Sequence, residues 1–260
     1  MNFSEVLRNA RAETDTAVPE GWMQGRAAFG GLAAALVYET IAGESDDAPL
    51  RSLTISFVAP AKQGKLERQA QVLRRGSSVT QIEGRGVQEG QVVTAALASF
   101  GRERTSSISV ALPTAPAFTA PEDCQALPDI EGLTPEFARH FDYRIAKGAL
   151  PYSGISDTRF GGWVRFRDCD EPVTISHLLA LIDAWPPAVL QMLSELAPAS
   201  SLTWTLELPH PLSQCSAADW WQYQAEIEQA ADGYAVIQAR VWDAHGRPVA
   251  LSRQTVTVFA

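Results

Sequence analysis

Two apolar segments with helical spacing stand out along the chain, FGGLAAALVYETI at 29–41 and HLLALIDAWPPAVL at 177–190. In the second segment, large side chains recur at intervals of three and four residues, and the pattern continues past Pro186 and Pro187. Both segments are apolar on nearly every side, which is typical of helices buried inside a protein. We therefore predict two buried helices, at 29–41 and 177–190.

Each predicted helix precedes a block of alternating, β-rich stretches. The first block comprises 52–57, 66–72, 79–87 and 92–100, and the second comprises 201–206, 220–227, 234–242 and 248–259. Glycine-bearing turns separate several of these stretches, as expected for hairpins. Two further strand-like stretches, FDYRIA and GGWVRFRD, come before the second helix. The repeated order of helix and strands indicates an internal duplication.

The duplication predicts an α+β protein with two antiparallel sheets, each wrapping one central apolar helix. We place the N-terminal unit at 1–112 and the C-terminal unit, which carries the candidate acid, at 136–260. The segment 113–135 is rich in Pro, Ala and Thr without periodicity, which is typical of a linker. Edge strands of the two units could pair and so remove an exposed sheet edge.

Composition and charge narrow the class of protein. The chain is 46% hydrophobic and 20% charged, as in ordinary globular proteins. No apolar run approaches the ~18 residues of a membrane span, and the charged N-terminus lacks the apolar core of a signal peptide. We expect a soluble, cytoplasmic protein without a membrane partner, and a homo-oligomer is compatible with these features.

The formal charge of −9 argues against a nucleic-acid partner, because phosphate binding requires a basic face. Three cysteines without a C-x-x-C pair and four scattered histidines do not suggest a disulfide framework or a metal site. We therefore expect no metal and no cofactor. A local basic turn, Arg74-Arg75-Gly76-Ser77-Ser78, could still bind a small anion, although a solvated hairpin turn explains it as well.

Asp183 interrupts the apolar pattern of the second helix. An ionised carboxylate in apolar surroundings costs several kcal/mol unless it is paired or hydrogen-bonded. From this segment alone, a side chain turned to solvent and a buried catalytic acid are equally good interpretations.

Three groups of residues carry a resemblance to a known family. They are RAAFGG at 26–31, SLTISFVAP at 52–60 followed by VLRRGSSV at 72–79, and the helix of Asp183 followed by SLTWTLELPHP and the terminal SRQTVTV. In this order and spacing, the chain resembles a double hotdog protein of the thioesterase-like superfamily, of the acyl-CoA thioesterase II type. The resemblance implies a hydrolase of lipid metabolism that cleaves acyl-CoA thioesters.

The resemblance also implies catalytic residues. The family's acid falls on Asp183, its glutamine on Gln254, and its hydroxyl on Ser201, with Thr203 next on the same strand face. This sequence departs from the family in having Leu32 after the Gly-Gly pair, where a polar residue is frequent, and a serine where threonine is usual.

The chemistry of these residue types fits thioester hydrolysis. Desolvation raises the pKa of a carboxylate toward the range useful to a general base, and Gln254 and Ser201 would orient the water. Backbone N–H groups near Gly31 and Leu32, at the start of the first helix, would bind the oxyanion. We expect the CoA end of the substrate near Arg75 and its neighbour Arg74.

Other functions remain to be weighed. Laying 177–185 over 30–38 puts Leu36 opposite Asp183, so only one of two quasi-equivalent sites would be active. A hotdog hydratase pairs an acid with a histidine, but His177 and Asp183 lie about 120° apart around a helix. No G-x-S-x-G motif supports a triad hydrolase. The remaining alternative is a noncatalytic acyl-binding or acyl-CoA-binding hotdog protein.

Overall fold

The computed structural model describes residues 1–260 apart from residues 14, 210 and 213. Its N-terminal half contains α1 (Phe3–Ala12), β1 (Asp15–Val18), β2 (Met23–Gln24), β3 (Ala27–Ala28), α2 (Gly30–Gly43), β4 (Leu50–Phe57), β5 (Gly64–Arg75), β6 (Val79–Gln88) and β7 (Gln91–Gly101). Its C-terminal half contains the short helices η1 (Pro121–Asp123), η2 (Glu136–His140) and η3 (Ala188–Met192), the helix α3 (Ile175–Asp183), and the strands β8 (Gln125–Ala126), β9 (Phe141–Lys147), β10 (Arg159–Phe166), β11 (Ala199–Glu207), β12 (Trp221–Ala231), β13 (Tyr234–Trp242) and β14 (Pro248–Val258).

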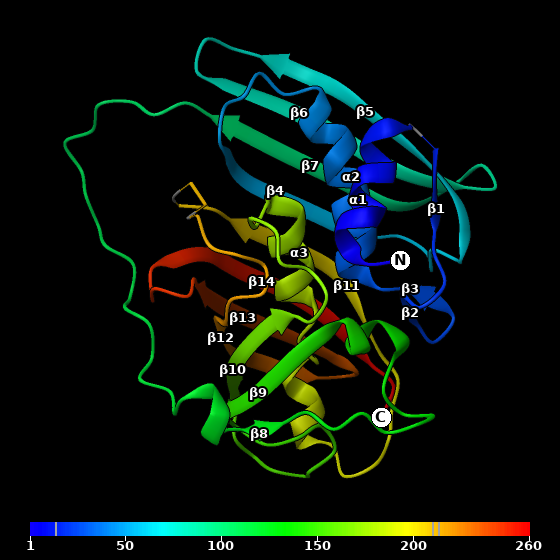
Figure 1. The fold of residues 1–260 in the computed structure, drawn as a ribbon, viewed down its shortest axis with the longest axis vertical. Helices are drawn as coiled ribbons and strands as arrows, with labels where there is room; N and C mark the ends of the chain where they lie inside the picture. The colour runs from blue at the N-terminus through cyan, green and yellow to red at the C-terminus, as the bar shows by residue number, and fades with distance from the viewer. Residues whose placement is uncertain (14, 210, 213) are drawn as a thin grey trace.

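In the described part of the chain, one continuous antiparallel sheet replaces the two sheets that we predicted, since edge strands of the two halves pair as expected; β2 and β3 form a small sheet of their own. Twelve strands run in the order β1-β5-β6-β7-β4-β11-β14-β13-β12-β10-β9-β8 (Figure 1). The halves join where β4 pairs with β11, from Thr203 opposite Ser56 to Glu207 opposite Ser52. This pairing supplies hydrogen-bond partners to two strands that would otherwise be edges. The α+β class and all eight strands of the predicted repeat are confirmed.

The two central helices pack against each other inside the sheet. Figure 1 shows α2 and α3 close together, with β5, β6 and β7 beside α2. Nine of the fourteen residues of α2 are buried, and so are seven of the nine in α3. No helix in the described part of the chain is long and apolar enough to cross a membrane.

Helix α3 is shorter than predicted, because the proline pair ends it. The helix stops at Asp183, and the chain turns before η3 begins at Ala188. A proline disfavours the helical conformation of the residue before it and cannot donate the helical hydrogen bond. Asp183 therefore stands at a helix end, where its side chain can reach beyond its own helix.

Residues 102–120 join the halves without a helix or strand, and the short elements η1 and β8 occupy part of the segment 113–135 that we predicted as a linker. The long green loop in Figure 1 follows this path from β7.

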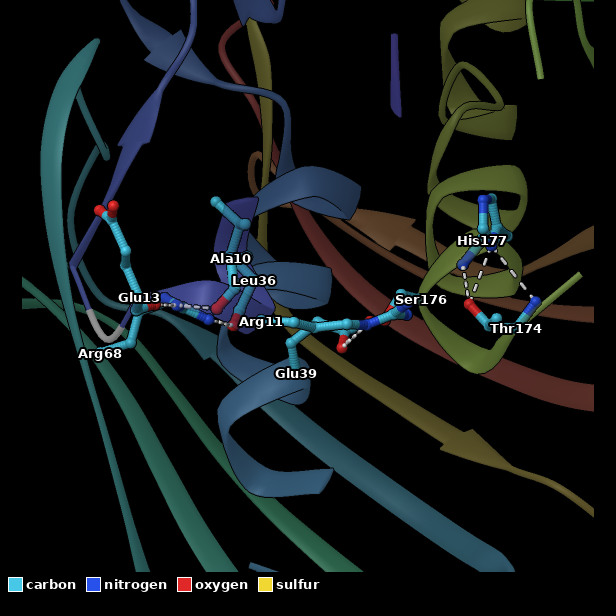
Figure 2. A network of polar contacts seen from close by, with 9 residues as sticks. All are labelled: Ala10, Arg11, Glu13, Leu36, Glu39, Arg68, Thr174, Ser176 and His177. Carbon is cyan, nitrogen blue, oxygen red and sulfur yellow. Dashed lines mark hydrogen bonds and ion pairs between the residues drawn. The ribbon is translucent and has the colours of Figure 1, made fainter. Parts of the chain in front are cut away.

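Helix α1 was not predicted and is fixed to α2 by a buried arginine. Asn2 caps its first turn, accepting a hydrogen bond from the Glu5 N–H at 2.9 Å. At the other end, the Arg68 guanidinium donates to the carbonyl oxygens of Ala10, Glu13 and Leu36 (Figure 2). These carbonyls include groups at the C-terminal end of α1 that have no partner within the helix. Arg68 thus ties α1 to the middle of α2.

His177 lies in a second buried cluster, at the start of α3. Its Nε2 atom is 3.1 Å from the Ser4 hydroxyl and 3.4 Å from the Cys169 sulfur. Its Nδ1 atom is 2.8 Å from the hydroxyl of Thr174, the N-cap residue (Figure 2). Burial lowers the pKa of His177 to about 4, so the ring is neutral at physiological pH.

His177 should make folding stability fall in acid. Below pH ~6.5 the unfolded chain binds a proton at this residue, whereas the folded chain does so only near pH 4. The contribution of His177 to the free energy of unfolding is therefore complete above pH ~6.5. On the order of 3 kcal/mol of it is lost as the pH falls to 4. Urea unfolding at pH 7 and pH 4 measures the loss. His177→Gln should reduce the difference between the two pH values, and an equal difference in both proteins would contradict this role.

Candidate active site

Asp183 brings together three elements from both halves of the chain. The Gln254 side chain, on β14, donates a hydrogen bond from Nε2 to Asp183 Oδ1 at 2.9 Å. The backbone N–H of Gly31, at the start of α2, donates to the same carboxyl group. Two of the residues predicted from the resemblance, Asp183 and Gln254, are thus in direct contact.

Enclosure gives the Asp183 carboxyl a pKa suited to acid–base chemistry. Part of the residue's surface reaches solvent, but the carboxyl group itself is surrounded by protein. Loss of solvation raises the pKa of Asp183 to about 7, while the hydrogen bonds from Gln254 and Gly31 lower it. Near neutral pH, this group can therefore both take up and release a proton.

Two glycines let α2 approach the carboxyl. A Cβ atom on Gly30 would lie 2.7 Å from Asp183 Oδ2 and 3.2 Å from Phe57 Cζ. A Cβ atom on Gly31 would lie 3.0 Å from the Cα atom of Ala180 on α3. The glycine pair therefore allows both close packing of α2 on α3 and close approach of α2 to Asp183.

The first turn of α2 offers a further backbone donor. Phe29, its N-cap residue, makes no side-chain cap hydrogen bond. The Gly31 N–H is directed to Asp183, whereas the Leu32 N–H has no backbone acceptor among the described residues. The helix dipole adds positive character at this end of α2. Of the two predicted oxyanion donors, Leu32 is the one not engaged by the carboxylate.

The two candidate hydroxyls lie on opposite faces of β11, contrary to the expectation that they share one. A β-bulge between Ser201 and Thr203 inserts an extra residue, so Ser201 lies opposite Val256 while Thr203 lies opposite Thr255. Gln254 lies opposite Trp204, on the face of Ser201 and Val256. Ser201 is thus the candidate hydroxyl on the same face of the sheet as Gln254, although no hydrogen bond between described residues joins it to Asp183 or Gln254.

Arg75 lies away from the other predicted site residues. It donates to the Glu44 carbonyl oxygen at 2.9 Å and is 3.6 Å from the Asp46 carboxylate. Glu44 caps the C-terminal end of α2, roughly 20 Å along the helix from Gly31. Arg74 lines a surface hollow on the same turn with Ser77, Ser78 and Arg104. Arg75 thus lies away from Asp183, and its predicted contact with the CoA end of the substrate stays a prediction.

A second acid occupies a nearly equivalent place in the other half, and the sequence comparison missed it. Glu39, near the end of α2, accepts a hydrogen bond from Ser176 at the start of α3, at 2.6 Å. Arg11 binds the same carboxylate through Nε and Nη2, at 2.7 and 2.8 Å (Figure 2). An ungapped alignment paired Asp183 with Leu36, because it could not show where the two helices touch.

The second arrangement lacks the glutamine. In the repeated strand motif, Ile55 corresponds to Trp204. Trp204 lies opposite Gln254, whereas Ile55 lies opposite Ala96. With Arg11 neutralising the acid and alanine in place of the amide, this arrangement is suited to an ion pair between α1 and α2.

A hydratase arrangement is not present around Asp183. His177 lies six residues earlier on α3, about 9 Å along the helix, and its ring contacts Ser4, Cys169 and Thr174 instead. The described residues around the Asp183 carboxyl therefore provide an amide and a backbone N–H, and no imidazole.

Comparisons with known proteins agree with this fold. Residues 18–101 match the family model described as acyl-CoA thioesterase N-terminal domain, and residues 121–258 match acyl-CoA thioesterase C-terminal domain. No curated protein matches the chain.

Solved structures resemble the whole chain at low identity. A conserved protein with a hot dog fold from Alicyclobacillus acidocaldarius is 22% identical, with a TM-score of 0.86 and 98% of each chain covered. An acyl-CoA thioesterase II from Mycobacterium marinum is 20% identical, with a TM-score of 0.72, covering 89% of this chain and 90% of that one. At these identities the likeness establishes the hotdog fold.

Gly30→Ala should disturb the site while leaving the fold intact. The new methyl group would press on the Asp183 carboxylate and Phe57, so we expect the hydrogen bond from Gln254 to be displaced. Gly43→Ala, at the other end of α2, is the matched control, because nothing lies within 4 Å of its added Cβ.

The Asp183 pKa, followed by carboxyl NMR, measures the difference between the two variants. It should shift in Gly30→Ala and stay near 7 in Gly43→Ala. Equal pKa values in both variants would show that Gly30 is not needed for the contact.

Proposed function

Because the chain belongs to the acyl-CoA thioesterase family, we propose that it hydrolyses the thioester bond of an acyl-CoA, with Asp183 as the general base. The observation that carries this proposal is the enclosed carboxyl of Asp183, held by Gln254 and by the Gly31 N–H, with a pKa of about 7. General-base assistance of this kind typically accelerates a reaction by about 10²–10⁴-fold.

The proposed reaction begins with water beside the Asp183 carboxylate. Asp183 removes a proton from the water while the water oxygen attacks the thioester carbonyl carbon. The tetrahedral intermediate then collapses, the carbon–sulfur bond breaks, and the CoA sulfur takes the proton back from Asp183. The products are a carboxylic acid and free CoA, and Asp183 returns to its starting state.

Gln254 and Ser201 are proposed to orient the attacking water. Gln254 donates one amide N–H to Asp183 Oδ1, and its amide oxygen can accept a hydrogen bond from the water. Ser201 lies on the same face of the sheet, and its hydroxyl can both donate and accept. Thr203 is left out, because its side chain is on the opposite face.

The Leu32 N–H is proposed to bind the oxyanion of the tetrahedral intermediate. It belongs to the first turn of α2, where the helix dipole favours negative charge. Gly30 and Gly31 let the start of α2 lie against Asp183 and α3, because a Cβ atom on either glycine would crowd Asp183 or Ala180. Removing one such donor typically costs about 3–4 kcal/mol of transition-state stabilisation.

The alternative is a noncatalytic protein that binds acyl groups or acyl-CoA. A carboxyl with a pKa near 7 favours the enzyme, because a mere binding site for an apolar chain gains nothing from an enclosed acid.

Asp183→Asn should abolish most activity without unfolding the protein. The amide keeps the size of the carboxyl but cannot accept the proton, so kcat on a panel of acyl-CoAs should fall at least about 100-fold. The midpoint of thermal unfolding should stay the same or rise, because an enclosed charge has been removed.

Glu39→Gln is the matched control, since it makes the same kind of change at the nearly equivalent acid of the other half. It breaks the ion pair with Arg11 and so should lower stability, with kcat remaining within about threefold of the wild-type value. Full activity in Asp183→Asn would contradict the role of Asp183 as the general base. Acyl-CoA binding without hydrolysis by the wild-type protein would favour the binding function.

A further inference from the structure

Two buried hydrogen-bond donors near Asp183 have no acceptor among the residues that the structure describes. They are the Tyr143 hydroxyl, on β9, and the Trp185 indole N–H, two residues after Asp183. Tyr143 is 4% exposed and Trp185 is 5% exposed, so neither side chain points its polar atom at bulk solvent. Neither donor has a part in the hydrolysis described above.

The two side chains belong to one aromatic cluster. The Trp185 ring stands at 84° to the Tyr143 ring, with the centroids 5.9 Å apart. On its other sides it stacks on Tyr223 at 5.0 Å and meets the edge of Phe160 at 5.6 Å. These contacts fix the Trp185 ring and, with it, the direction of its N–H.

The cluster lies within the electrostatic reach of the Asp183 carboxylate. Burial raises the pKa of Tyr143 and of Tyr223, and the charge of Asp183 raises both further. The sheet register agrees, since Tyr143 lies opposite Val164, which lies opposite Trp221. Tyr223, two residues further along β12, therefore shares the face of Tyr143. Trp185 follows Asp183 by two residues, so both donors lie in the part of the C-terminal half that is close to the Asp183 carboxyl.

The Tyr143 oxygen and the Trp185 indole nitrogen do not stabilise the packing of the cluster. A buried donor without a partner costs about 1–3 kcal/mol, and phenylalanine would fill the place of Tyr143 without that cost. Buried polar atoms left unpaired in a folded protein are few, and they call for a functional explanation. An acceptor that arrives with the substrate would supply the missing partner.

The chemistry of the donors selects the acceptor. The indole N–H can only donate, and the tyrosine hydroxyl has its hydrogen to offer. A carbonyl oxygen has two lone pairs and no hydrogen, so it can accept from both. A hydroxyl group would bring a hydrogen that itself needs an acceptor, and a saturated chain would leave both donors unpaired.

We propose that Tyr143 and Trp185 form an acyl-recognition site that selects acyl-CoAs carrying a ketone oxygen close to the thioester. The proposal rests on the proposed thioesterase function, because it assumes that the thioester lies at Asp183. It makes the two residues determinants of specificity, and neither touches the reacting bond.

The test compares 3-oxohexanoyl-CoA with hexanoyl-CoA, which differ by one carbonyl group. The measured quantity is the ratio of the two kcat/KM values, in the wild-type protein and in Tyr143→Phe and Trp185→Phe. Comparing ratios between proteins cancels the different intrinsic reactivities of the two thioesters. Each variant should lower the ratio about tenfold, as expected for the loss of one hydrogen bond, mainly through the 3-oxo substrate.

Tyr152→Phe is the matched control. It also removes one tyrosine hydroxyl, but that hydroxyl donates to the Ala197 carbonyl oxygen and is not part of the cluster. The control should keep the wild-type ratio. Tyr143→Phe removes a single oxygen atom without a partner, so it should fold at least as stably as the wild type, and it decides the question if Trp185→Phe does not fold.

Calorimetric binding to Asp183→Asn separates this proposal from the proposed function. That variant should bind the 3-oxo ester more tightly than hexanoyl-CoA, and adding Tyr143→Phe should remove the difference. Binding preference without hydrolysis in the wild-type protein would contradict only the thioesterase function. Equal affinities in Asp183→Asn, or an unchanged kcat/KM ratio in both phenylalanine variants, would overturn the recognition site.

Discussion

The Asp183 carboxylate can stay away from bulk water only because both halves of the chain supply a hydrogen-bond donor to it. Gln254 comes from the last strand, and the Gly31 N–H comes from the first buried helix. Without such donors, an enclosed charge costs several kcal/mol, and the group would remain protonated. The donors compensate only in part for the lost solvation, which leaves the pKa of Asp183 at about 7.

The rest of the fold holds these three groups together. The pairing of β4 with β11 makes one sheet of the two halves, and α2 and α3 pack inside it with glycine at the contact. The prolines after Trp185 end α3 at Asp183, so the acid reaches the start of α2 rather than the next turn of its own helix. The other half has a similar arrangement around Glu39. There, Arg11 neutralises the acid, and Ala96 occupies the position that corresponds to Gln254.

Periodicity and repetition were sufficient to predict the eight main strands and the two central helices, because each element alternates or repeats its apolar residues locally. The family resemblance identified Asp183 and Gln254, which the structure joins by a hydrogen bond. The tertiary contacts could not be predicted from the sequence. The bulge that puts Thr203 and Ser201 on opposite faces cannot be seen in the alternation of polar and apolar residues along β11. The contact of Glu39 with Ser176 depends on how two helices cross. The placement of the CoA end near Arg75 was based on charge alone and stays a prediction; Arg75 shares the Asp46 carboxylate with Arg102.

The pH dependence of kcat/KM tests the central claim most directly, because it reports the ionisation of the free enzyme's base. For an acyl-CoA substrate, kcat/KM should rise tenfold per pH unit in acid and level off near pH 7, the pKa of Asp183. In Gln254→Leu the plateau should be lower, and the rise should move to higher pH, because a hydrogen bond that lowers that pKa is gone. A rate that is independent of pH between 5 and 8, or a rise unmoved by Gln254→Leu, would contradict Asp183 as the general base.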